Sequence, residues 1–146
     1  MSPRKSRRAV RERSVPGSLA RSRCPVANSL EILGDRWTLL VIRDLFHGKK
    51  RYAEFAASKE GIPTNILSDR LKRLEDAGVI GSTLYSRHPP RAEYALTPKG
   101  RGLGPTLQSL IEWGLKYIPG TKVLEDRSRL RVAPLRDGAG TGVGVR

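Results

Sequence analysis

The spacing of apolar residues predicts four helices in the first part of the chain. Within each segment, apolar side chains recur every three or four positions, which places them on one helical face. The four predicted faces are Val26, Leu30 and Leu33; Trp37, Leu40, Val41 and Leu45; Tyr52, Phe55 and Ala56; and Leu67, Leu71 and Leu74. Helices commonly end at glycine, and each face is followed by one, at Gly34, Gly48, Gly61 and Gly78. Pro25 suits the first position of the first helix, and Asp35 can cap the second.

The period of the pattern changes after the fourth helix, which we expect from about Pro63 to Ala77. Val79–Tyr85 has the composition of a strand, and Arg91–Thr97 alternates apolar and polar residues. The proline-containing turn Ser86–Pro90 lies between them, so the two segments predict a β-hairpin.

A last helix is predicted to begin at Thr97 and Pro98 and to end at Pro119-Gly120. Its apolar face is Leu103, Leu107, Leu110, Ile111, Leu115 and Ile118. A short turn at Lys59–Ile62 joins the third and fourth helices. The order of elements therefore predicts a mainly α fold with a small β-hairpin wing, which is a winged helix-turn-helix.

The charge is distributed unevenly along the 146 residues, which suffice for one domain with tails. Lys and Arg number 28 against 14 Asp and Glu, a formal net charge of +14. Residues 1–23 carry +7, residues 24–120 carry +4 and residues 121–146 carry +3. We expect a basic disordered arm, a folded domain and a flexible Gly-rich tail over these three ranges. The arm shares its Arg- and Ser-rich composition with transit peptides.

Composition also narrows the class of function. The positive charge favours double-stranded DNA as a partner, and the longest apolar run, Leu39–Ile42, is too short to span a membrane. One cysteine excludes an internal disulfide, and His47 and His88 lack metal-ligand spacing. The glycine-rich stretch at 138–144 lacks the flanking strand and helix of a nucleotide-binding fingerprint. We expect no enzyme, no metal and no cofactor in a cytoplasmic, nucleoid-associated protein.

The fourth predicted helix has a polar face suited to reading DNA bases. That face carries Thr64, Asn65, Ser68, Asp69 and Lys72, opposite the leucines. Residues at the start of a recognition helix reach deepest into the major groove, where Asn pairs with adenine and Ser or Thr pairs with several bases. Arg70 and Arg73 are better placed for phosphates. The other interpretation of this face is a solvated amphipathic helix.

Two further basic groups flank this helix in the sequence. Lys49, Lys50 and Arg51 precede the helix-turn-helix, where they would contact phosphates and orient the protein. Arg87, His88 and Arg91 surround the predicted turn of the wing, where arginines suit a narrow minor groove. A solvated hairpin tip is the alternative for the second group.

Several segments together resemble the HxlR-type winged helix-turn-helix transcription regulators, relatives of the MarR group. They are CPVANSLEILGDRWTLLVIRDLFHGKKRYAEF, IPTNILSDRLKRLEDAGVI and RAEYALTPKGRGL. The resemblance covers roughly Cys24 to Ile118 and implies a DNA-binding homodimer whose outer helices pack across a two-fold axis. Two residues depart from the pattern: Tyr52 stands where the family usually has Phe, and Pro63 replaces a frequent Ser, which leaves Thr64 as the expected cap.

The resemblance also bears on dimerisation and regulation. We expect the dimer to use the first helix and the last, around Leu107, Leu110, Ile111 and Leu115. Cys24 begins a helix near arginines, which favours its thiolate form, and some family members sense oxidants through such a cysteine. The alternative is a packing residue in the interface. A small-molecule effector near Trp37 and Trp113 is conceivable, although tryptophans more often belong to the core.

The expected function is a sequence-specific, DNA-binding transcriptional regulator that acts as a homodimer on a palindromic operator and responds to a thiol reagent or a ligand. The alternative is a basic protein that coats nucleic acid without sequence preference. Only the former keeps a large preference for one operator.

Overall fold

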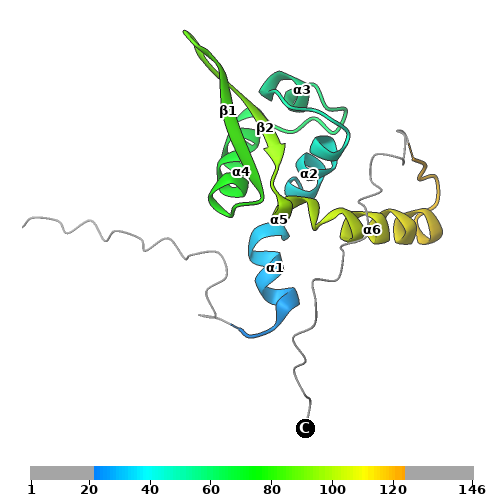
Figure 1. The fold of residues 1–146 in the computed structure, drawn as a ribbon. Coiled ribbons are helices and arrows are strands. Elements are labelled where there is room, and N and C mark those ends of the chain that lie inside the picture. The colour runs from blue at the N-terminus through cyan, green and yellow to red at the C-terminus, as the bar shows by residue number, and fades with distance from the viewer. Residues whose placement is uncertain (1–21, 124–146) are drawn as a thin grey trace, which may run out of the picture.

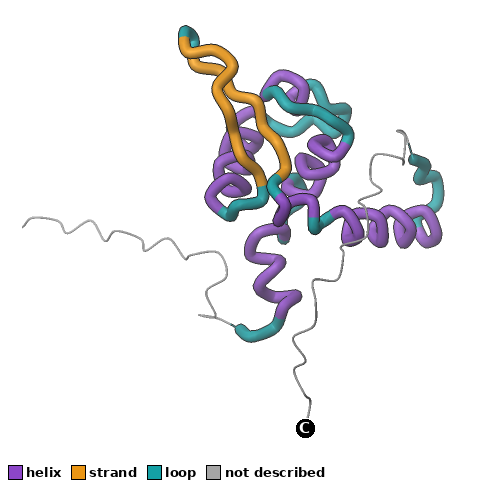
Figure 2. The backbone as a smooth tube through the Cα atoms, in the orientation of Figure 1, coloured by secondary structure: helices purple, strands orange, loops and turns teal. Residues whose placement is uncertain are grey.

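The computed structural model describes residues 22–123, which form a helical body with a projecting β-hairpin (Figures 1 and 2). The elements are α1 (Pro25–Leu33), α2 (Thr38–Phe46), α3 (Tyr52–Ala56), α4 (Thr64–Asp76), β1 (Ile80–Arg87), β2 (Pro90–Leu96), α5 (Pro98–Arg101) and α6 (Gly104–Tyr117). The mainly α fold with a two-stranded antiparallel wing is confirmed. Most of the predicted arm and tail lies outside the described residues.

Helix α2 lies at the centre of the body, in contact with α1, α4, α6 and β2. Val41 and Leu45 are buried as predicted, but the third core residue is Ile42, which is fully buried, whereas Leu40 is only partly buried. Thr38, one turn before Ile42, is buried too. The inward face of α2 is therefore turned by about one residue from the face that the sequence predicts, because neighbours surround this helix on several sides.

The helix-turn-helix is held by apolar contacts between α3, the turn and α4. Phe55 and Ile62 are buried, and Leu67, Leu71 and Leu74 form the inward stripe of α4, as predicted. Burial of one leucine side chain contributes about 2 kcal/mol to the free energy of unfolding. The stripe fixes which face of α4 is left for solvent.

The residues after the wing hold the end of α4. The Thr97 hydroxyl donates to the Gly78 carbonyl at 2.5 Å, and the Lys99 ammonium donates to the Ala77 carbonyl at 2.7 Å. The Thr97 hydroxyl also accepts from the Gly100 amide at 3.2 Å and so caps α5. Gly100 itself is buried, and a Cβ there would lie 2.1 Å from the Val79 carbonyl oxygen. The hydrogen bonds account for Thr97 and Lys99, and the close approach to Val79 accounts for a glycine at position 100.

The hairpin is longer than the sequence predicts. Its pairing runs from Ile80 opposite Leu96 to Arg87 opposite Pro90, with an irregularity between Leu84 and Ser86. Proline is tolerated at the first position of an edge strand, so the predicted turn residues are largely part of the strands. The base of the hairpin is anchored, since Leu96 packs against the core.

The single last helix of the prediction is two helices. Helix α5 ends at Arg101, and α6 begins at Gly104 and extends away from the body (Figure 1). Pro105 has no amide with which to continue the hydrogen bonds of α5, but it suits the first turn of a new helix. The apolar repeat continues across this break, so the repeat alone does not reveal it.

Candidate DNA-binding surface

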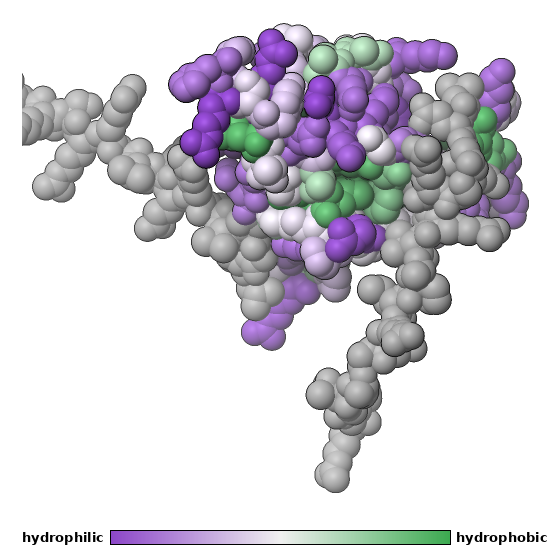
Figure 3. All heavy atoms as spheres, turned by 45° about the horizontal axis from the view of Figure 1, so that its top comes forward, coloured by the Kyte–Doolittle hydropathy of each residue, from purple (hydrophilic) through white to green (hydrophobic). Residues whose placement is uncertain are grey.

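The outer face of α4 carries the residues that the sequence predicts for base reading. All of them are exposed and lie opposite the buried leucines: Thr64, Asn65, Ser68, Asp69 and Lys72. Figure 3, which turns the hairpin end of the molecule forward, shows hydrophilic residues over much of this end.

The start of α4 is braced by a tyrosine of α3. The Tyr52 hydroxyl donates to the Thr64 carbonyl at 2.9 Å, and the Ser68 hydroxyl lies 3.1 Å from the same carbonyl and 3.3 Å from the Tyr52 hydroxyl. The one hydroxyl proton of Ser68 is used inside the protein, so Ser68 offers an acceptor to a ligand. Thr64 was predicted as the cap, but Pro63 occupies that position and Thr64 is the first helical residue.

Asn65 and Lys72 have the longest side chains on this face that make no hydrogen bond or ion pair within residues 22–123, and the short Thr64 hydroxyl makes none either. An exposed amide with both a donor and an acceptor unused matches the edge of adenine in the major groove. These two residues are the most available for contact with DNA.

The charged neighbours on α4 are engaged with one another. Arg70 lies 3.0 Å from a carboxylate oxygen of Asp35 and also pairs with Asp69, whose carboxylate lies 4.0 Å from Arg73. The Arg70 side chain is mostly buried, so it links α4 to the start of α2. The prediction of Arg70 as a phosphate contact is therefore not supported, whereas Arg73 stays exposed.

Asp35 organises the start of α2 as predicted. Its carboxylate accepts from the Trp37 amide at 2.8 Å and the Thr38 amide at 3.1 Å, and from the Thr38 hydroxyl. Burial raises the pKa of Asp35, but the hydrogen bonds from Thr38 and Trp37 and the ion pair with Arg70 outweigh burial, so the pKa is about 2. The ionised carboxylate thus stabilises both the helix start and the position of α4.

Within residues 22–123, only one of the three basic residues before α3 has a side chain without an ion-pair partner. Lys49 pairs with buried Asp44 at 3.1 Å. Arg51 pairs with Glu93 of β2 at 3.1 Å and stacks on the ring of Tyr85 at 4.1 Å. The contacts of Arg51 therefore brace the α2–α3 corner against the wing, whereas the Lys49 pair stays within the corner.

Lys50 joins the wing through its backbone alone. Its carbonyl accepts from the Tyr94 amide at 2.8 Å, and its amide donates to Glu54 at 2.6 Å. Hydrogen bonds from the amides of Lys50 and Arg51 lower the pKa of Glu54. The side chain of Lys50 is exposed and remains available for a phosphate.

The wing presents its basic residues at the tip of the hairpin. Arg87, His88 and Arg91 are all exposed, and the tip projects from the helical body (Figure 2). The Ser86 hydroxyl donates to the Pro89 carbonyl at 2.9 Å across the turn. The hairpin therefore holds these three basic residues away from the helical body. Such a position suits contact with a DNA groove next to the one that α4 would enter.

A second surface, apolar rather than basic, lies on α1 and α6. Val26 and Leu30 of α1 are 66% and 56% exposed, and Leu110 of α6 is 50% exposed. Leu115 is partly exposed, but Ile111 packs against the protomer's own core and Leu107 is buried in it. Leu107 was predicted for an interface and is instead a core residue.

Two aromatic residues extend this apolar face beyond the prediction. Trp113 and Tyr117 are more than half exposed, and their rings lie 5.6 Å apart. With Leu110 they stand at i, i+3 and i+7, a second stripe on α6 that the leucine repeat obscures. Cys24 is the N-cap of α1 and is exposed, two residues before the exposed Val26 of that helix.

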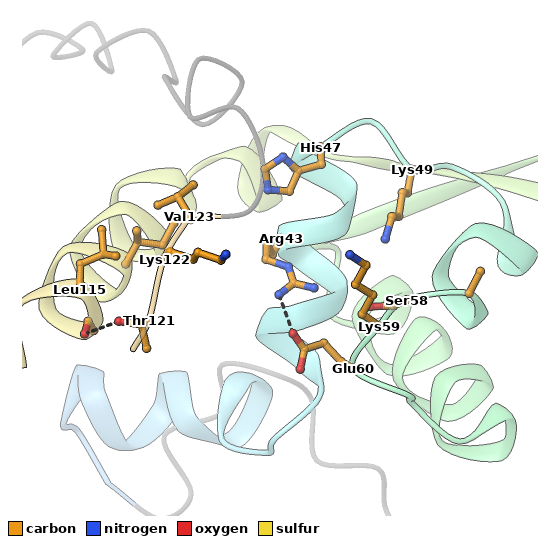
Figure 4. A pocket seen from close by; sticks show the side chains of 13 residues that line it. Arg43, His47, Lys49, Ser58, Lys59, Glu60, Leu115, Thr121, Lys122 and Val123 are labelled. Carbon is orange, nitrogen blue, oxygen red and sulfur yellow. Dashed lines mark hydrogen bonds and ion pairs between the residues drawn. The ribbon is translucent and has the colours of Figure 1, made fainter. Parts of the chain in front are cut away.

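Neither Trp37 nor Trp113, near which the sequence predicts an effector cleft, lines the cavity that lies between α2, the α3–α4 turn and α6 (Figure 4). Within residues 22–123, no group of three or more His, Cys, Asp or Glu could hold a metal ion, and no helix is long and apolar enough to cross a membrane.

Fold and surface together define a winged helix-turn-helix protein. The model of the HxlR-like helix-turn-helix family matches residues 32–122, so the chain belongs to that family. An uncharacterized HTH-type transcriptional regulator of Mycobacterium tuberculosis is 42% identical over 94 residues, which are 64% of this chain and 59% of the relative. The similar segment thus spans about three-fifths of that relative. The regulator YdeP of Bacillus subtilis is 39% identical over 94 residues, 64% of this chain and 73% of YdeP.

Solved structures of regulators show the same fold. The redox regulator HypR in its reduced form is 33% identical, with a TM-score of 0.59, over 64% of this chain and 92% of HypR. The reduced transcriptional regulator YodB of B. subtilis is 29% identical, with a TM-score of 0.56, over 68% of this chain and 98% of YodB.

Proposed function

We propose that the protein is a sequence-specific transcriptional regulator that binds double-stranded DNA as a homodimer. The observation that carries this proposal is the free, exposed Asn65 at the start of a braced α4, beside an exposed Lys50 and a basic wing tip. A recognition helix reads bases with its first residues, while flanking cations hold the phosphates. The family of the chain supports the same conclusion.

Each side chain on this surface has its own role in the proposal. Asn65 pairs with adenine through its amide, and Ser68 accepts a hydrogen bond from a base amino group. Lys50, Lys72 and Arg73 neutralise phosphates, and the wing arginines enter the minor groove, where negative potential concentrates. Asp69, already paired with Arg70, orients its neighbours rather than reading a base.

The apolar surface of α1 and α6 is the proposed dimer interface. Large apolar side chains are exposed on both helices: Val26 and Leu30 on α1, and Leu110, Trp113 and Tyr117 on α6. Such groups are typically covered by a partner. A two-fold axis would place the recognition helices about 34 Å apart, one turn of DNA, and would make the operator palindromic.

Selection of bound fragments from random DNA tests the proposal. Enrichment of one palindromic motif, bound by a dimer in sedimentation, is the expected result. Enrichment without a motif would instead establish the alternative, a basic protein that coats nucleic acid. The selection should be repeated with residues 22–123 to separate the domain from the basic arm and tail.

A thiol response is a second proposal, carried by the exposed Cys24 at the N-cap of α1, beside the proposed interface. HypR is a redox regulator of the same fold. Diamide would take two electrons and two protons from the Cys24 thiols of two protomers, which would leave an intersubunit disulfide and the reduced hydrazine. Non-reducing electrophoresis should show a covalent dimer that Cys24→Ser abolishes; a monomer under both conditions refutes this proposal.

A further inference from the structure

The attachment of the hairpin nearest to its tip lies at the residues just before α3. The Tyr94 amide donates to the Lys50 carbonyl at 2.8 Å, and Glu93 pairs with Arg51 in a single β-bridge. Beyond these contacts, residues 86–92 make no hydrogen bond or ion pair with the helical body within residues 22–123. Figure 2 shows this part of the hairpin projecting from the body. The direction of the tip therefore depends on the contacts around Arg51.

The side chain of Arg51 contacts both strands of the hairpin. Its Nε atom lies 3.1 Å from a carboxylate oxygen of Glu93 in β2, and its guanidinium carbon lies 4.1 Å from the centre of the Tyr85 ring in β1. Tyr85 has no partner in the strand pairing, because the register shifts between Leu84 and Ser86. Such an irregularity redirects a side chain, and here the redirected ring lies against Arg51.

Stability alone does not account for the ion pair between Arg51 and Glu93. Their side chains are 51% and 36% exposed, and an exposed pair adds little to stability because water and salt screen it. The pair does change which charges the surface presents. Of the adjacent Lys50 and Arg51, only Lys50 keeps a side chain without an ion-pair partner within residues 22–123.

The charge of Arg51 bears on specificity because phosphates repeat along every duplex. A cation that contacts phosphates strengthens binding to all DNA sequences alike. Specificity is the ratio between the affinity for an operator and the affinity for other DNA. A compensated Arg51 lowers the affinity for random DNA and removes no base contact. A wing already held in one direction also needs less ordering when its tip enters a groove.

We propose that Glu93 is a positioning residue that raises the specificity of DNA binding. Glu93 keeps Arg51 from phosphates, and through Arg51 and Tyr85 it fixes the direction of the wing. This inference rests on the proposed function, because it concerns the ratio between operator and random DNA.

Binding of the full chain to random-sequence duplex DNA at several salt concentrations tests the first role. Glu93→Gln should strengthen this binding about fivefold at about 0.1 M salt and steepen the salt slope by about one unit per protomer, because Arg51 gains a phosphate. Arg51→Gln should leave the slope unchanged, since the charge it removes is already compensated. Lys50→Gln, by contrast, removes an uncompensated cation and should make the slope shallower.

Two further variants separate this role from a general effect of charge. The double variant with Arg51→Gln and Glu93→Gln should keep the wild-type slope, because no cation is released. Asp76→Asn is the matched control, since Asp76 is an exposed carboxylate of α4 with no hydrogen bond or ion pair within residues 22–123. It should leave the slope unchanged.

Three results on random DNA would overturn the first role. They are a wild-type slope for Glu93→Gln, equal strengthening by Glu93→Gln with and without Arg51, and a slope for Arg51→Gln as shallow as that for Lys50→Gln. The third result does not depend on the Glu93 variant, so it decides the point even if that variant is poorly folded by circular dichroism.

The second role is measured on the selected operator. Glu93→Gln and Arg51→Gln should each lower the ratio of operator to random affinity about fivefold, because the wing is no longer held in one direction. Tyr85→Phe keeps the ring against Arg51 and should keep the ratio. A wild-type ratio in either charge variant overturns the effect on specificity. A chain that selects no operator overturns the proposed function, while the salt slopes on random DNA still decide whether Glu93 keeps Arg51 from phosphates.

Discussion

The Tyr52 hydroxyl lies 2.9 Å from the carbonyl oxygen of Thr64 and ties helix α3 to the first residue of α4. Ser68 joins the same cluster, so one phenol orders both the start of the recognition helix and a side chain on its outer face. Most of the tyrosine ring's packing would survive with phenylalanine, so the contribution of the hydroxyl can be separated from that of the ring.

Tyr52→Phe should keep the fold and lower the free energy of unfolding by about 1 kcal/mol, the usual net value of one hydrogen bond. Urea unfolding followed by circular dichroism measures the change. Tyr85→Phe is the control, because the Tyr85 hydroxyl makes no hydrogen bond within residues 22–123 and its ring would still stack under Arg51. Equal losses in the two variants would contradict the assigned contact.

Asn65→Ala should weaken operator binding by about 1–3 kcal/mol and leave binding to random DNA unchanged, because it removes one base contact and no charge. Competition of labelled operator against both DNAs measures the two affinities. A similar loss on operator and random DNA would show that Asn65 does not read a base.

Lys50→Gln should weaken all DNA alike and lower the salt slope by about one unit per monomer, since it removes one phosphate contact. Titrations at several salt concentrations provide the slope. Lys49→Gln differs in outcome: it leaves buried Asp44 with one cation fewer, so its main effect should be on stability. A Lys50 variant with an unchanged slope would exclude the phosphate contact.

Gly100→Ala should destabilise the domain by about 2–4 kcal/mol, because a Cβ would lie 2.1 Å from the Val79 carbonyl oxygen and force backbone to move. Gly81→Ala in β1 is the control, since its Cβ would meet nothing within 4 Å. Thermal unfolding of both variants measures the difference. If the two variants melt at the same temperature, the close approach at Gly100 is wrong.

Asp35→Asn should destabilise the protein near neutral pH and matter less in acid. The folded-state pKa of Asp35 is about 2, below its unfolded value, so the ionised group stabilises the fold above about pH 4 and this contribution is lost as pH falls toward 2. Urea unfolding of both proteins between pH 7 and pH 2.5 checks this. A difference that grows on acidification would contradict it.

The sequence predicts the elements of this fold well because local signals mark them. Glycines follow the ends of α1, α2 and α4 closely, whereas α3 ends at Ala56, well before Gly61. The leucine stripe of α4 has a strict period, so α4 and its outer face follow directly. The break at Pro105 was missed because the apolar repeat runs through it. Ile42 was missed because burial on α2 depends on neighbours from four other elements.

The pairing of charges could not be predicted. Arg70, Lys49 and Arg51 look like free cations in the sequence, but their partners Asp35, Asp44 and Glu93 come from other segments or from a buried helix face. Which cations remain for DNA depends on tertiary contacts. Asn65 and Lys50, by contrast, stay available because nothing in the described domain packs over them.

The two ends of α4 are attached to the body through backbone carbonyls, without any contribution from the side chains of Asn65 and Lys72. Tyr52 holds a backbone carbonyl at the start, and Thr97 and Lys99 hold backbone carbonyls at the end. Exchanging Asn65 or Lys72 therefore leaves the attachment intact. A lineage carrying this scaffold can acquire a new target sequence by a few surface substitutions, with folding and target choice free to evolve separately.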